Sequence, residues 1–218
     1  MQVKNRILTG FILSFLLLSL FTFAFYVLPV ESETWSVDDD GPADFRSIQE
    51  AINNASSGDT IFVHNGTYYE KIIIDKRLTL RGENKEHTII NGSGFQYLGS
   101  LVMITADNAT ISSFTVTNAR QGGIQVENSQ FCDVNDNIVR FTGDRGIILG
   151  SGGNHRVYDN SVSNSSAYGG IDVIRSNNNT IYNNMVFSNV WGISINSGSH
   201  NEIFNNTLYA NRDTGIHV

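Results

Sequence analysis

A short element recurs along the second half of the chain and constrains the fold more than any other feature. It has the form Gly-Ile-x-aliphatic, and its isoleucines are separated by 23, 24, 22 and 23 residues. These isoleucines are Ile124, Ile147, Ile171, Ile193 and Ile216. A register this constant indicates a solenoid, in which each repeat stacks on its neighbours.

Each repeat carries two further aliphatic columns. One lies ten residues after the repeated isoleucine (Val134, Val157, Ile181 and Ile203), and the other lies five residues further on (Val139, Val162, Val186 and Leu208). Pairs such as Ile124 and Val126 place two side chains on one face of a strand. Three short strands per repeat predict an all-β fold, a right-handed parallel β-helix with coils of about 23 residues over residues 60–218.

An asparagine recurs between the second and third aliphatic columns. Its copies are Asn137, Asn160, Asn184 and Asn206, and Phe114 stands at this place in the preceding coil. Stacked side-chain amides satisfy turn backbone groups, so these residues are predicted to form a structural ladder. A leucine-rich repeat would need a regular L-x-x-L-x-L pattern, and a β-sandwich would not keep the constant register.

Residues 34–60 are predicted to form an N-terminal cap with a short helix. Phe45, Ile48 and Ile52 have helical spacing after Asp44, which is a good N-cap residue, and Gly58 follows the expected helix end. Such a helix would cover the open end of the solenoid. At the other end, Val218 closes the first strand of a new coil. We therefore expect the native chain to continue, or to associate end to end with another copy.

Residues 1–30 have the charge order of a signal peptide or an N-terminal membrane anchor. Lys4 and Arg6 precede an apolar run from Ile7 to Leu28. The rest of the chain is predicted to be exported, either secreted or held at the cell surface through this membrane contact. Seven N-glycosylation sequons are compatible with that location, at Asn54, Asn65, Asn91, Asn108, Asn164, Asn178 and Asn205.

The formal net charge of -7 and the scattered basic residues argue against nucleic acid as a partner. The single cysteine, Cys132, excludes an internal disulfide.

Several segments resemble the NosD-type β-helix family, within the pectate-lyase-like CASH superfamily. They are WSVDDDGPADFRSIQEAI from Trp35, GDTIFV from Gly58, the segment from Gly66 to Gly82, and the later G-I-x-V coils. The resemblance implies the β-helix fold. It also implies one of three roles, since the family includes surface proteins, frequently archaeal, polysaccharide-active enzymes and a periplasmic protein linked to copper-site maturation.

The same resemblance directs attention to the outer face of the first strand column, where polysaccharide sites of the superfamily lie. Asp172, Ser194 and His217 stand there on successive coils and are catalytic candidates. Serine between the other two makes a poor triad, so polar positions on a solvated face are the favoured interpretation. The neighbouring pair Asp144 and Arg145 is predicted to lie in an exposed turn. Gln125, Tyr168 and Trp191 are ligand-binding candidates, the two rings because they could stack on sugars.

Metal binding has two candidate groups. Cys132 and His155 occupy equivalent positions on adjacent coils, followed by Asn179 and Asn201. A thiol beside an imidazole begins a copper or zinc site, but a polar turn column is the favoured interpretation. Residues Asp38 to Asp40 could hold calcium, although they lack the spaced acceptors of a calcium loop.

Two main functions follow. The first is an extracellular or cell-surface module that binds glycans, adheres or supports structure without catalysis, with a polysaccharide or surface glycan as partner. The alternative is a polysaccharide lyase, hydrolase or epimerase, which rests on the superfamily resemblance. A copper-handling periplasmic protein is a third, minor possibility.

Overall fold

The computed structural model describes residues 32–96 and 99–218. The predicted signal peptide or anchor, residues 1–30, lies outside the described residues. Within the described ranges, no helix combines the length and apolarity needed to cross a bilayer.

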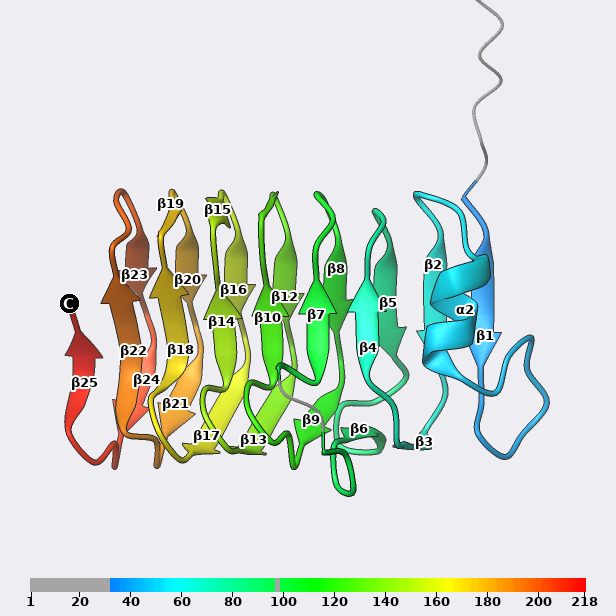
Figure 1. Cartoon of the computed structure of the whole chain (residues 1–218), viewed down its shortest axis with the longest axis horizontal. Coiled ribbons are helices and arrows are strands. Elements are labelled where there is room, and N and C mark those ends of the chain that lie inside the picture. The colour runs from blue at the N-terminus through cyan, green and yellow to red at the C-terminus, as the bar shows by residue number, and fades with distance from the viewer. Residues whose placement is uncertain (1–31, 97–98) are drawn as a thin grey trace, which may run out of the picture. The chain divides into compact units, whose positions relative to one another are not determined.

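Residues 32–218 form a stack of coils that is a right-handed parallel β-helix of the predicted kind (Figure 1). Three long sheets run along the described part of the stack, and each strand pairs in parallel with its copy one coil away. The repeated isoleucines are in register from Ile124 through Ile147, Ile171 and Ile193 to Ile216.

Sheet A contains β1 (Thr34–Val37), β2 (Thr60–Val63), β5 (Thr79–Gly82), β8 (Thr110–Ser112), β12 (Asp133–Asn135), β16 (Arg156–Tyr158), β20 (Thr180–Tyr182) and β23 (Glu202–Phe204). Sheet B contains β3 (Gly66–Tyr68), β6 (Thr88–Asn91), β9 (Thr115–Thr117), β13 (Ile138–Thr142), β17 (Ser161–Ser165), β21 (Met185–Phe187) and β24 (Thr207–Tyr209). Sheet C contains β4 (Ile72–Ile74), β7 (Val102–Ile104), β10 (Ile124–Val126), β14 (Ile147–Leu149), β18 (Gly169–Ile174), β22 (Trp191–Asn196) and β25 (Thr214–His217). A short ladder of β11 (Ser129–Gln130), β15 (Gly152–Gly153) and β19 (Ser176–Asn177) crosses one corner.

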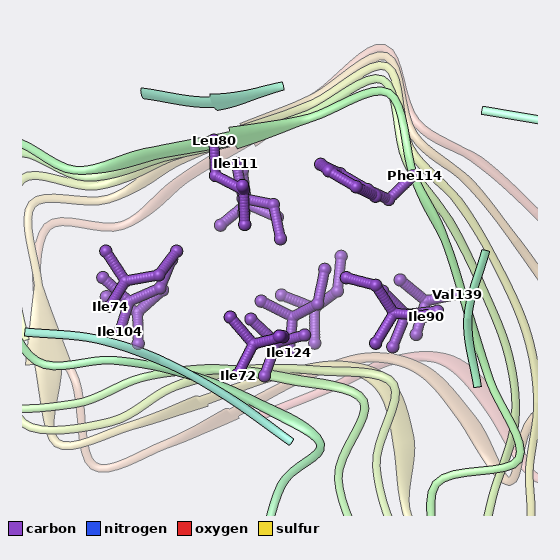
Figure 2. Close-up of a cluster of buried hydrophobic side chains, with 14 of the residues drawn as sticks. Ile72, Ile74, Leu80, Ile90, Ile104, Ile111, Phe114, Ile124 and Val139 are labelled. Carbon is purple, nitrogen blue, oxygen red and sulfur yellow. The ribbon is translucent and has the colours of Figure 1, made fainter. Parts of the chain in front are cut away.

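The aliphatic columns fill the interior, as the repeat predicts. Ile124, Ile147, Ile171 and Ile193 are fully buried, and so are the members of the other two columns up to Ile181 and Val186. Figure 2 shows the packing in the earlier coils, where Phe114 turns inward among isoleucines and Val139. Ile203 and Leu208 in the last coil are partly buried, and Ile216 is exposed.

The short helix is present, but it starts later than the sequence suggests. Helix α2 spans Ile48–Asn54 and its N-cap is Ser47, which accepts a hydrogen bond from the Glu50 backbone N–H. Asp44 is not the cap, because its carboxylate accepts hydrogen bonds from the backbone N–H and hydroxyl of Ser36. Glu70 accepts the backbone N–H groups of Ile48 and Gln49, which are otherwise without partners at a helix start.

The helix lies against β1, β2 and β4, beside the first strand of sheet C. The Gln49 side chain accepts the backbone N–H of Ile73 and donates to its carbonyl, so it pairs with the outer edge of β4. The expected cap therefore covers the free edge of sheet C at β4 and satisfies backbone groups there. Residues 34–37 are strand β1, which already belongs to sheet A through its pairing with β2.

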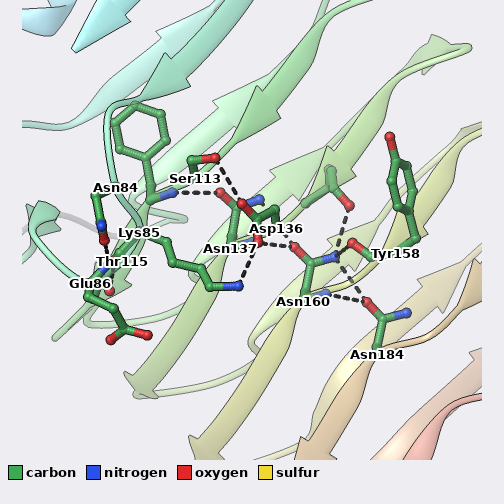
Figure 3. Close-up of polar contacts among 12 residues, drawn as sticks. Asn84, Lys85, Glu86, Ser113, Thr115, Asp136, Asn137, Tyr158, Asn160 and Asn184 are labelled. Atoms are coloured by element: carbon green, nitrogen blue, oxygen red, sulfur yellow. Dashed lines mark hydrogen bonds and ion pairs between the residues drawn. The ribbon is translucent and has the colours of Figure 1, made fainter. Parts of the chain in front are cut away.

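The asparagine column forms a continuous ladder in the turns between sheets A and B (Figure 3). In each coil the side-chain oxygen accepts the backbone N–H of the asparagine one coil earlier, from Asn206 to Asn184, Asn160 and Asn137. The Asn137 oxygen accepts the backbone N–H of Phe114, which begins the ladder. These hydrogen bonds join equivalent turns of adjacent coils and so help to fix their register.

Candidate functional site

Three aromatic rings from successive coils form a row at the edge of sheet C. Tyr168 precedes β18, Trp191 begins β22 and His217 lies in β25. The Tyr168 and Trp191 ring centroids are 5.8 Å apart, and the Trp191 and His217 rings are stacked at 4.5 Å with planes 4° apart. We call these three residues the ring platform. Tyr168 is exposed, and the other two rings are partly exposed.

A buried acidic residue lies next to this platform. Asp172 is fully buried, and its Oδ2 accepts a hydrogen bond from Arg145 Nε at 2.5 Å. Arg145 also pairs with Asp144 at 2.6 Å, and its guanidinium carbon lies 3.9 Å from the centre of the Tyr168 ring. Asp172 therefore holds the arginine on which the first ring of the platform rests.

The environment of Asp172 favours its neutral form. Burial raises the pKa of the Asp172 carboxyl above its usual value, and the opposing charge of Arg145 offsets part of that effect. Asp172 Oδ1 is buried without a hydrogen-bond partner in the described structure. Such an unsatisfied carboxylate oxygen is costly and marks this position as unusual.

The structure corrects two expectations for this face. Asp172 and Ser194 do not lie on a solvated surface, because both are fully buried on the outer side of sheet C. Arg145 is not part of an exposed charged turn either, since it bridges Asp144 and Asp172 and its side chain is only 21% exposed. The alternation of side chains along each strand correctly predicted that Asp172 and Ser194 lie on the outer side of sheet C. It could not predict that other side chains bury them there.

The catalytic candidates do not form a triad. Ser194 accepts a hydrogen bond from Asn196 Nδ2 at 2.9 Å, and no hydrogen bond joins it to His217 within the described residues. His217 stacks on Trp191 instead. Gln125 lies two coils away, where it accepts from the Ser100 hydroxyl and donates to Glu127. It belongs to a separate polar group.

Cys132 and His155 lie in a second buried ladder, in the turn before sheet A. His155 Nδ1 accepts the backbone N–H of Cys132, and the side-chain oxygen of Asn179 accepts the backbone N–H of His155. Asn201 continues the series. Burial lowers the pKa of His155 from 6.5 to about 4 and raises the pKa of the Cys132 thiol. Cys132, His155, Asn179 and Asn201 therefore form a column of hydrogen-bonded turn residues, which is the interpretation that the sequence favours over a metal site.

The described residues contain one close group of three or more carboxylate, imidazole or thiol ligands, the trio Asp38, Asp39 and Asp40. Asp38 accepts the backbone N–H of Asp40, and Asp39 accepts that of Thr67. The hydrogen bond from the Gly41 backbone is the largest cause that lowers the pKa of Asp38. Three carboxylates so close together would attract a hard cation, but some of their oxygens already accept hydrogen bonds from backbone N–H groups.

Two features were not predicted from the sequence: the contact of Asp213 with the ring platform, and a third asparagine ladder. Asp213 accepts a hydrogen bond from Trp191 Nε1 at 2.8 Å and so orients the central ring of the platform. A third ladder contains Asn189 and Asn211, and the Asn189 side-chain oxygen accepts the backbone N–H of Ser165. Asn189 and Asn211 each follow a ladder asparagine by five residues, a repeat that could have revealed them.

The fold defines the chain as a parallel β-helix protein, and the ring platform lies on its surface. The chain belongs to the family described as periplasmic copper-binding protein (NosD), which matches residues 52–218. A cell surface glycoprotein of Methanothermus fervidus is 34% identical over 98 residues, which are 44% of this chain and 16% of that protein. These similarities support an exported, extracellular β-helix protein.

Solved structures with this fold include pectin methylesterases. A mutant enzyme in complex with hexasaccharide IV superposes with a TM-score of 0.51 at 15% identity, over 76% of this chain and 66% of that one. Pectin methylesterase PemA from Erwinia chrysanthemi has a TM-score of 0.49 at 18% identity, over 77% of this chain and 65% of that one. The chain thus spans slightly less than two thirds of these enzymes, and at this identity the likeness concerns the fold alone.

Copper, which the family's description implies, does not fit the described residues of this chain. His155 Nδ1 is occupied by the backbone N–H of Cys132, and burial raises the pKa of the Cys132 thiol, which favours its protonated form. His155 Nε2 is left without a partner, but neither His155 nor Cys132 belongs to a described group of three or more carboxylate, imidazole or thiol ligands. The remaining group of ligands, the Asp38 to Asp40 trio, offers hard oxygens, whereas copper prefers imidazole, thiolate and thioether.

Proposed function

We propose that this chain is an extracellular glycan-binding module and that its ring platform receives sugar rings. The observation that supports this proposal is the row of Tyr168, Trp191 and His217, with successive ring separations of 5.8 and 4.5 Å. Trp191 and His217 stack face to face, and the Tyr168 ring is tilted by 58° against Trp191, so the row offers ring edges one coil apart as a repeating apolar surface to a repeating polymer.

Polar groups at the border of the platform would fix the orientation of a sugar. Asp213 and Asp144 provide carboxylate acceptors for hydroxyl groups, and Arg145 provides N–H donors. Asp213 and Arg145 also contact a platform ring, so the rings are held before a ligand arrives. A platform ordered in advance loses less conformational entropy on binding.

Titration of the full chain with a panel of neutral and acidic oligosaccharides tests the proposal. Replacing Trp191 by Ala removes the central ring, and we expect binding to weaken by about 5- to 30-fold, since an aromatic contact of this size contributes on the order of 1–2 kcal/mol. Phe187→Ala is the matched control. Phe187 is also half-buried and stacks on one ring, that of Tyr209 at 4.9 Å, but on sheet B. Equal affinity of the Trp191 variant and the wild type would reject the platform.

A second candidate function is favoured by Asp172. A buried carboxyl with a raised pKa, an unpartnered oxygen and a neighbouring Arg145 is the kind of group that serves as an acid in polysaccharide-active enzymes. The first function is preferred because Asp172 is fully buried, so a substrate could reach it only after the Arg145 and Tyr168 side chains had moved.

Turnover assays separate the two functions. Products from any member of a polyuronate and neutral glycan panel, lost in Asp172→Asn, would establish the enzyme. Saturable binding without products, retained in Asp172→Asn and lost in Trp191→Ala, is the result expected for a binding module.

A further inference from the structure

A second site lies on sheet A, away from the ring platform. A surface groove of about 570 Å³ runs across the beginnings of β5, β8, β12 and β16. Its lining includes Arg77, Asn108, Phe131, Asp133, Asn154 and Arg156. Thr79, Thr110, Asp133 and Arg156 are in register, so Arg77, Asn108, Phe131 and Asn154 occupy equivalent turn positions two residues earlier. The volume is that of a site for a small ligand.

Phe131 is the unusual residue of this turn column. Its backbone has a φ of 58°, in the left-handed region, and the residues at its place in the adjacent coils are Asn108 and Asn154, with φ of 57° and 58°. Asparagine tolerates this conformation, whereas a bulky aromatic residue is strained in it. The side chain is 56% exposed, so burial of the ring does not offset the strain. A strained, exposed aromatic residue at the wall of a groove points to a ligand that uses the ring.

Two arginines give the groove its charge. Arg156 is held by Asp133, with its Nε 2.8 Å from the Asp133 carboxylate. Arg77 is exposed, and no described residue forms an ion pair with it. The three charged lining residues therefore leave one positive charge, on an arginine whose guanidinium N–H groups are free to bind an anion. Because strands lie about 4.8 Å apart, Arg77 and Phe131 are separated by about 10 Å along the groove.

We infer that this groove binds an anionic oligosaccharide. The Phe131 ring stacks on one sugar, and Arg77 binds a carboxylate or sulfate group of a sugar further along. The chemistry of the groove differs from that of the ring platform, because its aromatic surface is a single ring and its specificity comes from charge. The inference is independent of the proposed function, since the two sites are on different sheets.

Calorimetric titration of the full chain tests the inference. The chain is produced without N-glycosylation, because Asn108 begins a sequon and its glycan would occupy the groove. The probes are tetragalacturonate, its neutral methyl ester, and a sulfated tetrasaccharide. We expect one or both anionic probes to bind, the ester to bind at least about tenfold more weakly, and Arg77→Gln to lose that difference, as for other hydrogen bonds to charged groups. The stronger anionic probe identifies the charged group. Equal binding of the ester, or no binding of either anion, would overturn the inference.

The strain at Phe131 provides a second readout. Phe131→Asn introduces the residue found at this place in the adjacent coils, so we expect the melting temperature to rise while binding of the anionic probe is lost. Phe141→Asn is the matched control. Phe141 has a φ of 54°, is 53% exposed and lies in the same coil, but it does not line the groove. This variant should gain stability and bind normally. Normal binding of the anionic probe by Phe131→Asn would refute the location.

Discussion

Asp172 and His155 show how burial in this fold affects a titratable side chain. Both are buried, and in both cases burial shifts the pKa toward the neutral form, upward for the carboxyl and downward for the imidazole. Asp172 keeps a charged partner in Arg145. His155 accepts a backbone N–H at Nδ1, and its Nε2 is buried without a partner in the described structure. Burial therefore favours the protonated form of Asp172 and the unprotonated form of His155.

His155 makes stability depend on pH in a defined window. Its pKa is about 4 in the folded protein and 6.5 in the unfolded chain, so the unfolded chain binds more protons between these values. The stability that a neutral His155 preserves is complete above pH 6.5 and is lost as the pH falls toward 4. At pH 5 the loss amounts to about 2 kcal/mol.

The variant His155→Asn should remove this dependence. Asn179 and Asn201 already occupy the same ladder, so we expect a change below about 1 kcal/mol at pH 7 and a smaller loss than the wild type at pH 5. Urea unfolding at both pH values measures it. His200→Asn is the control, because His200 is at an exposed turn position and its replacement leaves the His155 ladder intact. Parallel pH curves for the wild type and His155→Asn would contradict the assignment.

At the scale of elements, the ladders hold the turns between sheets. Asn160 is buried, accepts the backbone N–H of Asn137, and donates to the carbonyls of Val134 and Tyr158. One side chain thus satisfies backbone groups of its own coil and of the coil before it.

Asn160→Leu is expected to lower the free energy of unfolding by about 1–3 kcal/mol, because it leaves buried backbone groups without partners. Chemical denaturation measures the change. Asn135→Leu is the control, since Asn135 is only half-buried and lies on the outer side of β12. A loss at Asn135 as large as that at Asn160 would mean that general packing, and not the ladder, sets the cost.

At the scale of the whole solenoid, stability comes from contacts between adjacent coils. Each fully buried isoleucine of the first column is in register with its copies above and below, so the central coils are supported on both sides. A defect in a central coil therefore breaks contacts in two directions, whereas a defect in the last described coil breaks them in one.

Ile171→Asp places an unpaired charge in the central column and should destabilise the protein by about 4 kcal/mol or more. Circular dichroism melting, with hydrogen exchange of the flanking coils, measures the effect. The matched substitution is Ile216→Asp in the same column, where the side chain is 48% exposed and the charge stays hydrated. A melting curve unchanged by Ile171→Asp would be incompatible with the buried column.

The sequence by itself determined the coil period, the aliphatic columns and the asparagine ladder. In a solenoid, residues one period apart become neighbours, so a repeat along the chain is at once a contact list. Phe131 shows where this logic stops. It occupies an asparagine turn position, and the repeat could not reveal that its ring would line a groove with Arg77 from two coils away.

Only the tertiary structure decided the site. The burial of Asp172 depends on Arg145, 27 residues away, and the orientation of Trp191 depends on Asp213, 22 residues away. The Arg145 and Asp213 side chains extend from turns that precede strands, so their direction follows from local backbone geometry and not from the period. The helix start moved from Asp44 to Ser47 for the same reason, because Ser36 on β1 bonds the Asp44 carboxylate. Strand periodicity depends on the backbone, which every coil shares, while the site depends on side chains that no other coil repeats.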